Sequence, residues 1–375
     1  MKRDLVVFGE DWGAHPSSTQ HLVRHLCSDR KVIWINSIGM RRPRLSRSDV
    51  SRALRKVRQM AHPITNHPNA FLPRNLSVLE PRALPLPGNK IAGFVNRRTI
   101  GQAIKAEMGR RNIVNPVVWA SLPTAVDVIG AFPDNEVVYY CGDDFGALNG
   151  VDHGPVLGCE KRLAERADLI LASSEYLCAK FDAPKTRYLP HGVDLNRFAT
   201  PFPRAKDLPK GKKVAGFYGS ISAWLDIDLL RRTACLLPDW KFVFIGNVSV
   251  DVSTLNALPN VVFLGPKEHA ELPGYVQHWT ASLLPFVDNA QIRACNPLKL
   301  REYLAAGRPV IATSFPALDP YLAHISVAST PETFALELKK AETEPSSTAK
   351  CRSESVSCED WKARANDLGG WLDAV

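Results

Sequence analysis

Residues 296–310 include the side chains that most directly suggest chemistry. Asn296 can cap a helix, Pro297 suits its first position, and Gly307 can end it in a left-handed turn. Lys299 would then lie in the first turn, where a cation opposes the helix dipole at a cost of roughly 0.3–1 kcal/mol. A bound anion removes this conflict, because free backbone N–H groups and a Lys together form a phosphate site.

Glu302 follows Lys299 by three residues, so the two side chains share one face of the expected helix. Its carboxylate can accept hydrogen bonds from sugar hydroxyls one turn further into the helix. An i,i+3 ion pair on a solvated face accounts for the same spacing. The segment therefore predicts either a phosphate site with a sugar beside it or an ordinary charged surface.

Two adjacent acids, Asp143 and Asp144, follow the apolar run of residues 137–141. The carboxyl ends of parallel strands are where α/β proteins bind ligands. A carboxylate there can remove a proton from an acceptor hydroxyl as that hydroxyl attacks an anomeric carbon. Because adjacent residues face different ways, we expect only one acid to reach a substrate. The alternative is an Asp that caps a turn.

Two glycine-bearing loops supply weaker candidates. Gly219 allows the backbone to approach a diphosphate closely, and Ser220 adds a hydrogen-bond donor. After the first apolar run, Asp11 or His15 can meet acceptor hydroxyls, although a plain loop that ends in a serine helix cap fits equally well. Neither loop is G-x-G-x-x-G, and Asn36 stands where a dinucleotide site needs an acid, which argues against a dinucleotide oxidoreductase.

The 375 residues suffice for two domains with full cores. The net charge of +9 indicates an anionic partner, which can be a nucleotide, a membrane surface or a nucleic acid. None of the eight cysteines forms a C-x-x-C pair, which favours a reduced compartment. No apolar run has the length of a signal peptide or a membrane span, so we expect a cytoplasmic protein.

Strand-like apolar runs alternate with helical patterns along the whole chain, which predicts an α/β fold of two Rossmann-like domains with a ligand cleft between them. We expect the first domain at residues 1–200 and the second at 201–357, because residues 201–213 have the composition of a proline-rich polar linker. The polar segment 344–357 predicts a surface loop, and residues 358–375 predict a final helix.

A basic segment at residues 41–58 has eight Lys and Arg residues against one acid, Asp49, with apolar residues interleaved. Parts of it can form a basic amphipathic helix that lies on anionic lipid, or it can be a solvated loop. No nucleic-acid recognition motif accompanies it. The residues expected to meet lipid are Arg41, Arg42, Arg44 and Arg47.

Several motifs in order resemble those of two-domain GT-B glycosyltransferases of the GT4-like kind. They are N-P-x-K-x-x-E-Y-L-A-A-G-x-P-V-I from Asn296, H-G-V-D at residues 191–194, the Gly219-Ser220 turn, and Gly265-Pro266-Lys267. The resemblance implies that Lys299 meets the donor diphosphate, Glu302 meets ribose or sugar hydroxyls, and the turn with Pro266 and Lys267 reads the base. It also implies that the last helix packs back on the first domain.

Two positions bear on the mechanism. Retaining members of the resembling family have another Glu eight residues before the one that matches Glu302. In this sequence Ala294 stands at that position. The inverting xanthan-type glucuronosyltransferase has an Asp at the strand end that matches Asp143. The resemblance therefore favours Asp143 as the base of an inverting transfer.

The resemblance implies a glycosyltransferase that moves a sugar from a nucleotide sugar, by preference a UDP-sugar, to a hydroxyl of a glycan or lipid-linked acceptor in exopolysaccharide biosynthesis. It would need no metal and act at the inner face of the cytoplasmic membrane. Two alternatives remain open: a GT-B-fold UDP-sugar 2-epimerase, which needs no acceptor, and a non-catalytic membrane-associated scaffold.

Overall fold

The computed structural model describes residues 2–14, 17–40, 72–148, 150–211, 213–345 and 347–375. The chain forms two compact units. Unit 1 comprises Met1–Pro190 with Arg364–Val375, and unit 2 comprises His191–Ala363. The divisions therefore fall at 190 and 363, whereas the sequence predicts 200 and 357.

The shift of the first division has a physical cause, because residues 191–200 already pack on unit 2. Val193 and Phe198 belong to its apolar core, and Gln277 Nε2 donates to the Phe198 carbonyl at 2.8 Å. The proline-rich segment that follows packs there as well. The Phe202 N–H donates to Gln277 Oε1 at 2.9 Å, and the Tyr275 hydroxyl donates to Asp207 Oδ1 at 2.6 Å. The segment is thus part of unit 2 and does not act as a free linker.

Unit 1 contains a seven-stranded parallel sheet in the order β3-β2-β1-β4-β5-β6-β7. The central strand β1 aligns Leu5 with Val32 on one side and with Val117 on the other. Most of its strands are buried along their whole length, as expected of a parallel sheet covered on both faces. The strands are β1 (Leu5–Phe8), β2 (Val32–Ile35), β3 (Leu76–Leu79), β4 (Val117–Ala120), β5 (Val137–Cys141), β6 (Leu169–Ala172) and β7 (Thr186–Tyr188).

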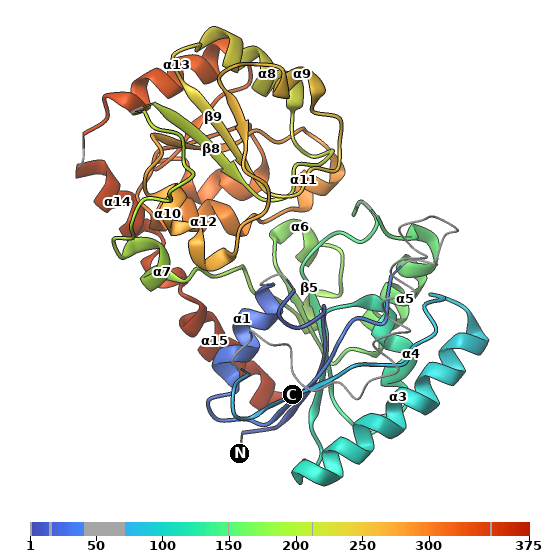
Figure 1. The fold of residues 1–375 in the computed structure, drawn as a ribbon. Helices are drawn as coiled ribbons and strands as arrows, with labels where there is room; N and C mark the ends of the chain where they lie inside the picture. Colours follow the sequence, from blue (N-terminus) through green and yellow to red (C-terminus); the bar gives the residue numbers. More distant parts are fainter. Residues whose placement is uncertain (1, 15–16, 41–71, 149, 212, 346) are drawn as a thin grey trace. The chain divides into compact units, whose positions relative to one another are not determined.

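Helices flank this sheet on both sides (Figure 1). Ser17 caps the first helix by accepting a hydrogen bond from the Gln20 N–H, and Asn89 caps α3 in the same way. One side has α1 (Ser18–Leu26) and α15 (Trp361–Ala374), and the other has α3 (Lys90–Arg111), α4 (Val126–Ile129) and α5 (His153–Arg166). The short helix α6 (Glu175–Cys178) follows β6.

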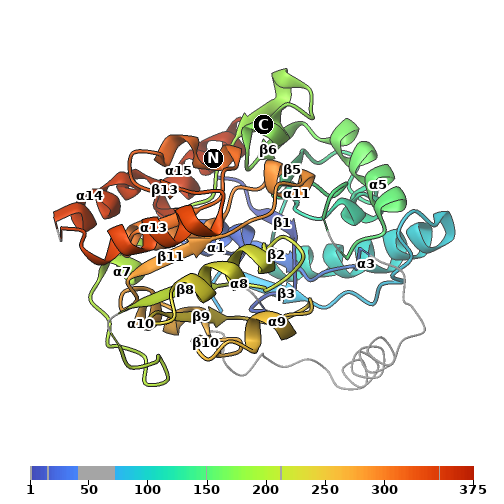
Figure 2. The same ribbon diagram turned by 90° about the horizontal axis from the view of Figure 1, so that it is seen from above.

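Unit 2 contains a six-stranded parallel sheet in the order β10-β9-β8-β11-β12-β13. Figure 2 shows β11, β8, β9 and β10 side by side. The strands are β8 (Val214–Tyr218), β9 (Lys241–Ile245), β10 (Val261–Phe263), β11 (Ala281–Leu284), β12 (Val310–Ala312) and β13 (Ser326–Val327).

The helices of unit 2 complete a continuous apolar core that extends from Val193 to Val356. In Figure 1, α8, α9 and α13 lie on one side of the sheet, with α10 and α12 on the other. The helices are α7 (Leu195–Ala199), α8 (Ile227–Leu236), α9 (Ser253–Asn256), α10 (Pro273–Val276), α11 (Ala290–Ala294), α12 (Leu298–Ala305), α13 (Pro331–Glu342) and α14 (Ser347–Ser355).

Helix α14 corrects the prediction of a surface loop at residues 344–357. Its sequence has no apolar periodicity, but Arg352 is buried and donates hydrogen bonds to the carbonyl groups of His324 and Gly307. A buried guanidinium that satisfies backbone carbonyls holds this helix in place, and no local pattern in the sequence reports such contacts.

Both sheets reverse their strand order at one point, between β1 and β4 in unit 1 and between β8 and β11 in unit 2. Ligands of open α/β sheets bind beside the carboxyl ends of strands at such a point. The residues that follow β1, β4, β8 and β11 are therefore candidates for ligand binding, together with those that follow β5, the neighbour of β4.

Candidate functional site

Helix α12 begins at Leu298, with Pro297 at the N-cap position and no side-chain cap. The prediction that Asn296 caps this helix is wrong. The Asn296 side chain is buried and its Oδ1 accepts a hydrogen bond from Arg301 Nη1 at 2.6 Å. The first backbone N–H groups of α12 therefore have no side-chain acceptor, which leaves them suited to an anion.

Lys299 lies in the first turn of α12, beside the turn that follows β8. Its Nζ is 5.6 Å from the ring centre of Phe217 and 5.8 Å from that of Phe286. Desolvation by burial lowers the pKa of Lys299. No ion pair of this ammonium group is found in the described part of the chain, so its charge is available for a ligand.

Gly219 makes room for this lysine. Its φ of +131° is in the region that favours glycine, and a Cβ there would lie 2.9 Å from Lys299 Cε. Two further glycines with positive φ, Gly246 and Gly265, follow the neighbouring strands β9 and β10. The Gly246 N–H donates to the Gly265 carbonyl at 3.0 Å. Half-buried glycine turns thus line the carboxyl ends of three adjacent strands, a setting in which a diphosphate can approach closely.

Glu302 is buried one turn after Lys299, and both of its oxygens accept hydrogen bonds. The Tyr218 hydroxyl donates to Oε2 at 2.5 Å, and His269 Nε2 lies 2.6 Å from Oε1. The resemblance gave no role to His269, and the 33 positions between it and Glu302 hide the contact from any local pattern.

The remaining predicted donor residues are placed less distinctively. Ser220 is exposed immediately after Gly219, and Pro266 is exposed after β10. The Lys267 ammonium pairs with Asp207 Oδ2 at 2.5 Å and lies 5.9 Å from the Tyr275 ring centre. Lys267 is thus engaged within unit 2, unlike Lys299.

In unit 1, Asp143 follows β5 at a position that solvent can reach, although protein atoms surround its carboxyl group closely. Desolvation, followed by the negative charges of Glu10 and Asp144, raises the pKa of Asp143 to about 6. Such a carboxyl group is suited to accept a proton near neutral pH.

Asp144 is engaged differently, as expected for adjacent residues that face different ways. Its Oδ1 pairs with Lys180 Nζ at 2.8 Å and accepts from the Gly146 N–H at 3.1 Å. Lys180 also lies 3.5 Å from the buried Glu160. The ion pair with Lys180 leaves Asp143 as the better candidate for a base.

Glu10 is a residue that the sequence reasoning missed. It directly follows Gly9 after β1, and desolvation raises its pKa while a 2.8 Å hydrogen bond from Ser17 opposes the shift. The sequence feature that could have identified Glu10 is its position as an acid at the end of a central strand.

Asp11 fixes the loop after β2, because its Oδ1 accepts from the Ser37 N–H at 3.1 Å. The serine cap weighed as an alternative for the loop after β1 is present at Ser17. His15, Arg41, Arg42, Arg44 and Arg47 lie outside the described residues.

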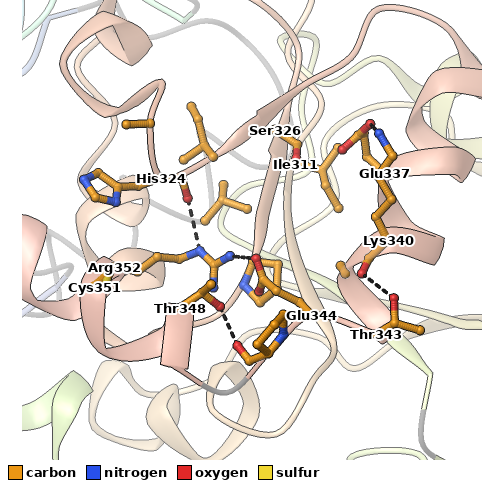
Figure 3. Close-up of a pocket in the computed structure, with 16 residues that line it drawn as sticks. Ile311, His324, Ser326, Glu337, Lys340, Thr343, Glu344, Thr348, Cys351 and Arg352 are labelled. Carbon is orange, nitrogen blue, oxygen red and sulfur yellow. Dashed lines mark hydrogen bonds and ion pairs between the residues drawn. The ribbon is translucent and has the colours of Figure 1, made fainter.

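Figure 3 shows a cavity of about 540 Å³ in unit 2, lined by residues of α13 and α14 and by the start of β12. It lies at the amino end of β12, whereas Gly219 and its neighbours follow the carboxyl ends of β8–β10. Its charged side chains are already paired, Lys340 with Glu337 and Arg352 with Glu344. These pairs indicate a structural role.

Across the described ranges, no group of three or more His, Cys, Asp and Glu side chains is placed to hold a metal ion. No helix in those ranges is long and apolar enough to cross a bilayer.

The fold matches solved structures over nearly its whole length. Sucrose-phosphate synthase of Thermosynechococcus elongatus has a TM-score of 0.70 at 16% identity, covering 100% of this chain and 99% of that one. HepE of Anabaena, solved with UDP and glucose, has a TM-score of 0.69 at 12% identity and full coverage of both chains. The alpha,alpha-trehalose-phosphate synthase (UDP-forming) of Burkholderia xenovorans, solved with glucose-6-phosphate, has a TM-score of 0.64 at 11% identity, covering 99% of this chain and 100% of that one. The fold is GT-B.

Two sequence comparisons match part of the chain. Residues 212–341 match the family model of glycosyl transferases group 1. The Bacillus subtilis protein TuaH, whose name assigns it as a glycosyltransferase of teichuronic acid biosynthesis, is 29% identical over 221 residues. This match covers 53% of the chain and 56% of TuaH, about half of each protein. The comparisons thus show a GT-B fold for the chain and a match to glycosyl transferases group 1 within unit 2.

Proposed function

We propose that this protein transfers a sugar from a nucleotide sugar, by preference a UDP-sugar, to a hydroxyl of a glycan or lipid-linked acceptor in polysaccharide biosynthesis. The observation that carries the proposal is Lys299, a partly buried ammonium at an uncapped helix start with no ion pair among the described side chains. The group 1 match to unit 2, the UDP in the HepE structures and the name of TuaH support it.

In the proposed step, Asp143 accepts the proton of the acceptor hydroxyl. The oxygen so freed forms a bond with the anomeric carbon of the donor sugar, while the bond from that carbon to the diphosphate oxygen breaks and UDP leaves. Lys299 and the N–H groups of α12 stabilise the charge that develops on the diphosphate, in place of a metal ion. Glu302 orients the donor.

We propose inversion at the anomeric carbon. Ala294, at the position of the first Glu of retaining members, offers no carboxylate, and a base at Asp143 suits direct displacement. Product analysis by NMR tests this point, since the product of an α-linked donor would be β-linked. A product with retained configuration would assign Asp143 another role.

Replacing Lys299 by Ala tests nucleotide binding. Loss of one charge-assisted contact costs on the order of 1.5–3 kcal/mol, so the Kd for UDP should rise roughly 10- to 150-fold in calorimetry. Lys350→Ala is the matched control, because that side chain is 80% exposed on α14. Equal affinity of wild type and Lys299→Ala would remove Lys299 from the site.

The transfer itself is tested by UDP release from a panel of UDP-sugars, with and without glycan acceptors. A transferase releases UDP only when the acceptor is present. Conversion of a UDP-sugar without acceptor would indicate the 2-epimerase alternative. Absence of both, with intact nucleotide binding, would favour the scaffold.

We also propose that the protein docks on the anionic inner face of the cytoplasmic membrane. Residues 81–106 contain five Lys and Arg and no acid. On α3, Ile91 and Phe94 are 76% and 67% exposed, and Arg98 follows on the same helical face. Exposed apolar side chains flanked by cations fit the interface of an anionic bilayer.

Co-sedimentation with phosphatidylglycerol vesicles tests this docking. Replacing Ile91 and Phe94 by Ser should reduce binding several-fold, and Gln at Arg41, Arg42, Arg44 and Arg47 should reduce it further, since each cation contributes about 1 kcal/mol. Leu336→Ser, at a 52% exposed apolar position on α13, should have no effect. Wild-type protein that stays in the supernatant at low salt would rule the docking out.

A further inference from the structure

A line of hydrogen bonds leads from α7 to the carboxylate of Glu302 on α12. Arg197 Nη1 lies 2.9 Å from His269 Nδ1, and His269 Nε2 lies 2.6 Å from Glu302 Oε1. The His269 ring also packs edge-on against Phe198, with 5.5 Å between ring centres. All of these residues belong to unit 2.

The direction of these hydrogen bonds follows from the donor types. A guanidinium group can only donate, so His269 Nδ1 must accept from Arg197. The ring proton then resides on Nε2, which donates to Glu302. Desolvation and the charge of Glu302 keep the pKa of Tyr218 well above its usual value, so its hydroxyl donates to the other carboxylate oxygen.

We propose that Arg197 and His269 are positioning residues for Glu302 in donor binding, an inference that rests on the proposed function. With a protein donor on each oxygen, the carboxylate has a fixed plane in which it can accept hydrogen bonds from ribose or sugar hydroxyls. A carboxylate fixed in advance binds hydroxyls without the entropy cost of ordering its own side chain.

Asp194 anchors the far end of this line. Its Oδ1 accepts from the Arg197 N–H at 3.1 Å and so caps α7, and its Oδ2 lies 3.4 Å from Arg197 Nε. Asp194 ends the H-G-V-D tetrapeptide, and Glu302 ends N-P-x-K-x-x-E. Two motifs about a hundred residues apart thus form one structural network in unit 2.

Two substitutions at one position separate positioning from packing. His269→Gln keeps an N–H donor near the place of Nε2, whereas His269→Ala removes it. We expect His269→Ala to raise the Kd for the UDP-sugar about 10- to 50-fold in calorimetry, and His269→Gln to stay within about threefold of wild type. His278→Ala, which removes another hydrogen-bonded histidine of unit 2, is the control and should bind as wild type.

Arg197→Gln gives an independent readout that does not depend on the stability of the His269 variants. Side-chain ¹⁵N NMR should show the Nε2–H form of His269 in wild type and a mixture of ring forms in Arg197→Gln. If Arg197 acts only through His269, the double variant Arg197→Gln/His269→Ala should have the same Kd for the UDP-sugar as His269→Ala alone. Losses of affinity that add in the double variant would contradict a role of Arg197 through His269.

The outcomes distinguish this inference from the proposed function. Wild type that binds neither UDP nor a UDP-sugar overturns the proposed function and the positioning role with it. Wild type that binds, with folded His269→Ala within twofold of it, overturns the positioning role alone. Loss of binding in His269→Gln equal to that in His269→Ala would also overturn it, because the restored donor should rescue.

Discussion

At the scale of single residues, Asp143 and Lys299 share one property. Burial shifts the pKa of each toward the neutral form, upward for the acid and downward for the base. Asp144 and Lys267, their neighbours in the sequence motifs, have opposite charges beside them. Charged groups left without a partner reduce the stability of a protein, and they are found where a ligand supplies the partner.

Asp143→Asn should fold and bind the donor but lose transfer by a factor of roughly 10²–10⁴, the usual share of general-base catalysis. Since the base must be unprotonated and its pKa is about 6, the wild-type rate should fall as the pH drops below that value. Steady-state rates from pH 5 to 8 check both points. An Asp144→Asn variant that is inactive while Asp143→Asn is near wild type would move the assignment by one residue.

The same variant has a consequence for stability. A carboxyl group whose pKa rises from 3.8 to about 6 on folding favours the folded state only while it is protonated, and this contribution is lost as the pH rises through that range. At pH 7.5, Asp143→Asn should therefore be more stable than wild type, by about 1 kcal/mol after discounting for solvent access, or a Tm higher by about 2–4 °C. Below pH 4 the difference should vanish.

At the scale of elements, the turn after β8 determines whether Lys299 has space. Gly219→Ala places a methyl group at φ +131° against Lys299 Cε. We expect at least a tenfold loss of UDP affinity and about 1–2 kcal/mol of destabilisation. Gly109→Ala, on an open part of α3 with no atom within 4 Å of the added Cβ, is the control and should stabilise by about 0.5–1 kcal/mol. Calorimetry and thermal melts of both variants decide the matter.

Elements with local signals were predictable from the sequence. The apolar run of residues 137–141 coincides with β5, because continuous apolar runs mark buried parallel strands. Gly307 ends α12 with a φ of +71°, as its position indicates. Helix α14 and the two-residue strand β13 were missed, since long-range contacts rather than local periodicity hold them.

The candidate site divides in the same way. Asp143 is recognisable in the sequence because it follows an apolar strand. Lys299 is recognisable because it lies in the first turn of a helix with clear start and end signals. The engagement of Glu302 by His269 and Tyr218, and of Asn296 by Arg301, depends on contacts between distant elements. Composition and spacing report which side chains are present at an edge of the sheet but not which of them are already paired.

At the scale of the whole molecule, the last helix, α15, is held to unit 1 by ion pairs and hydrogen bonds. Arg30 is 3% exposed and donates to both oxygens of Asp373, at 2.7 and 2.8 Å, and to the Gly369 carbonyl at 3.1 Å. Its neighbour Arg3 donates to the Val375 carbonyl at 3.0 Å. The stability of unit 1 thus depends on residues from both extremes of the sequence.

Asp373→Ala should destabilise unit 1 by about 2–3 kcal/mol, because it leaves a buried guanidinium with fewer partners. The expected decrease in Tm is about 5–10 °C. Asp239→Ala, which removes a solvent-exposed partner of Lys213, should change Tm by less than about 2 °C. Equal melting of the two variants would show that the last helix contributes little to unit 1.

The position of residues 364–375 also has a consequence for synthesis in the cell. Unit 2 is one uninterrupted stretch, and the ribosome finishes it before the segment that unit 1 still lacks. At about 5–20 residues per second, residues 191–363 take roughly 10–35 s, during which Arg30 has no carboxylate from Asp373. A chain released early would have a folded unit 2 and an incomplete unit 1, a species that proteases can recognise and remove.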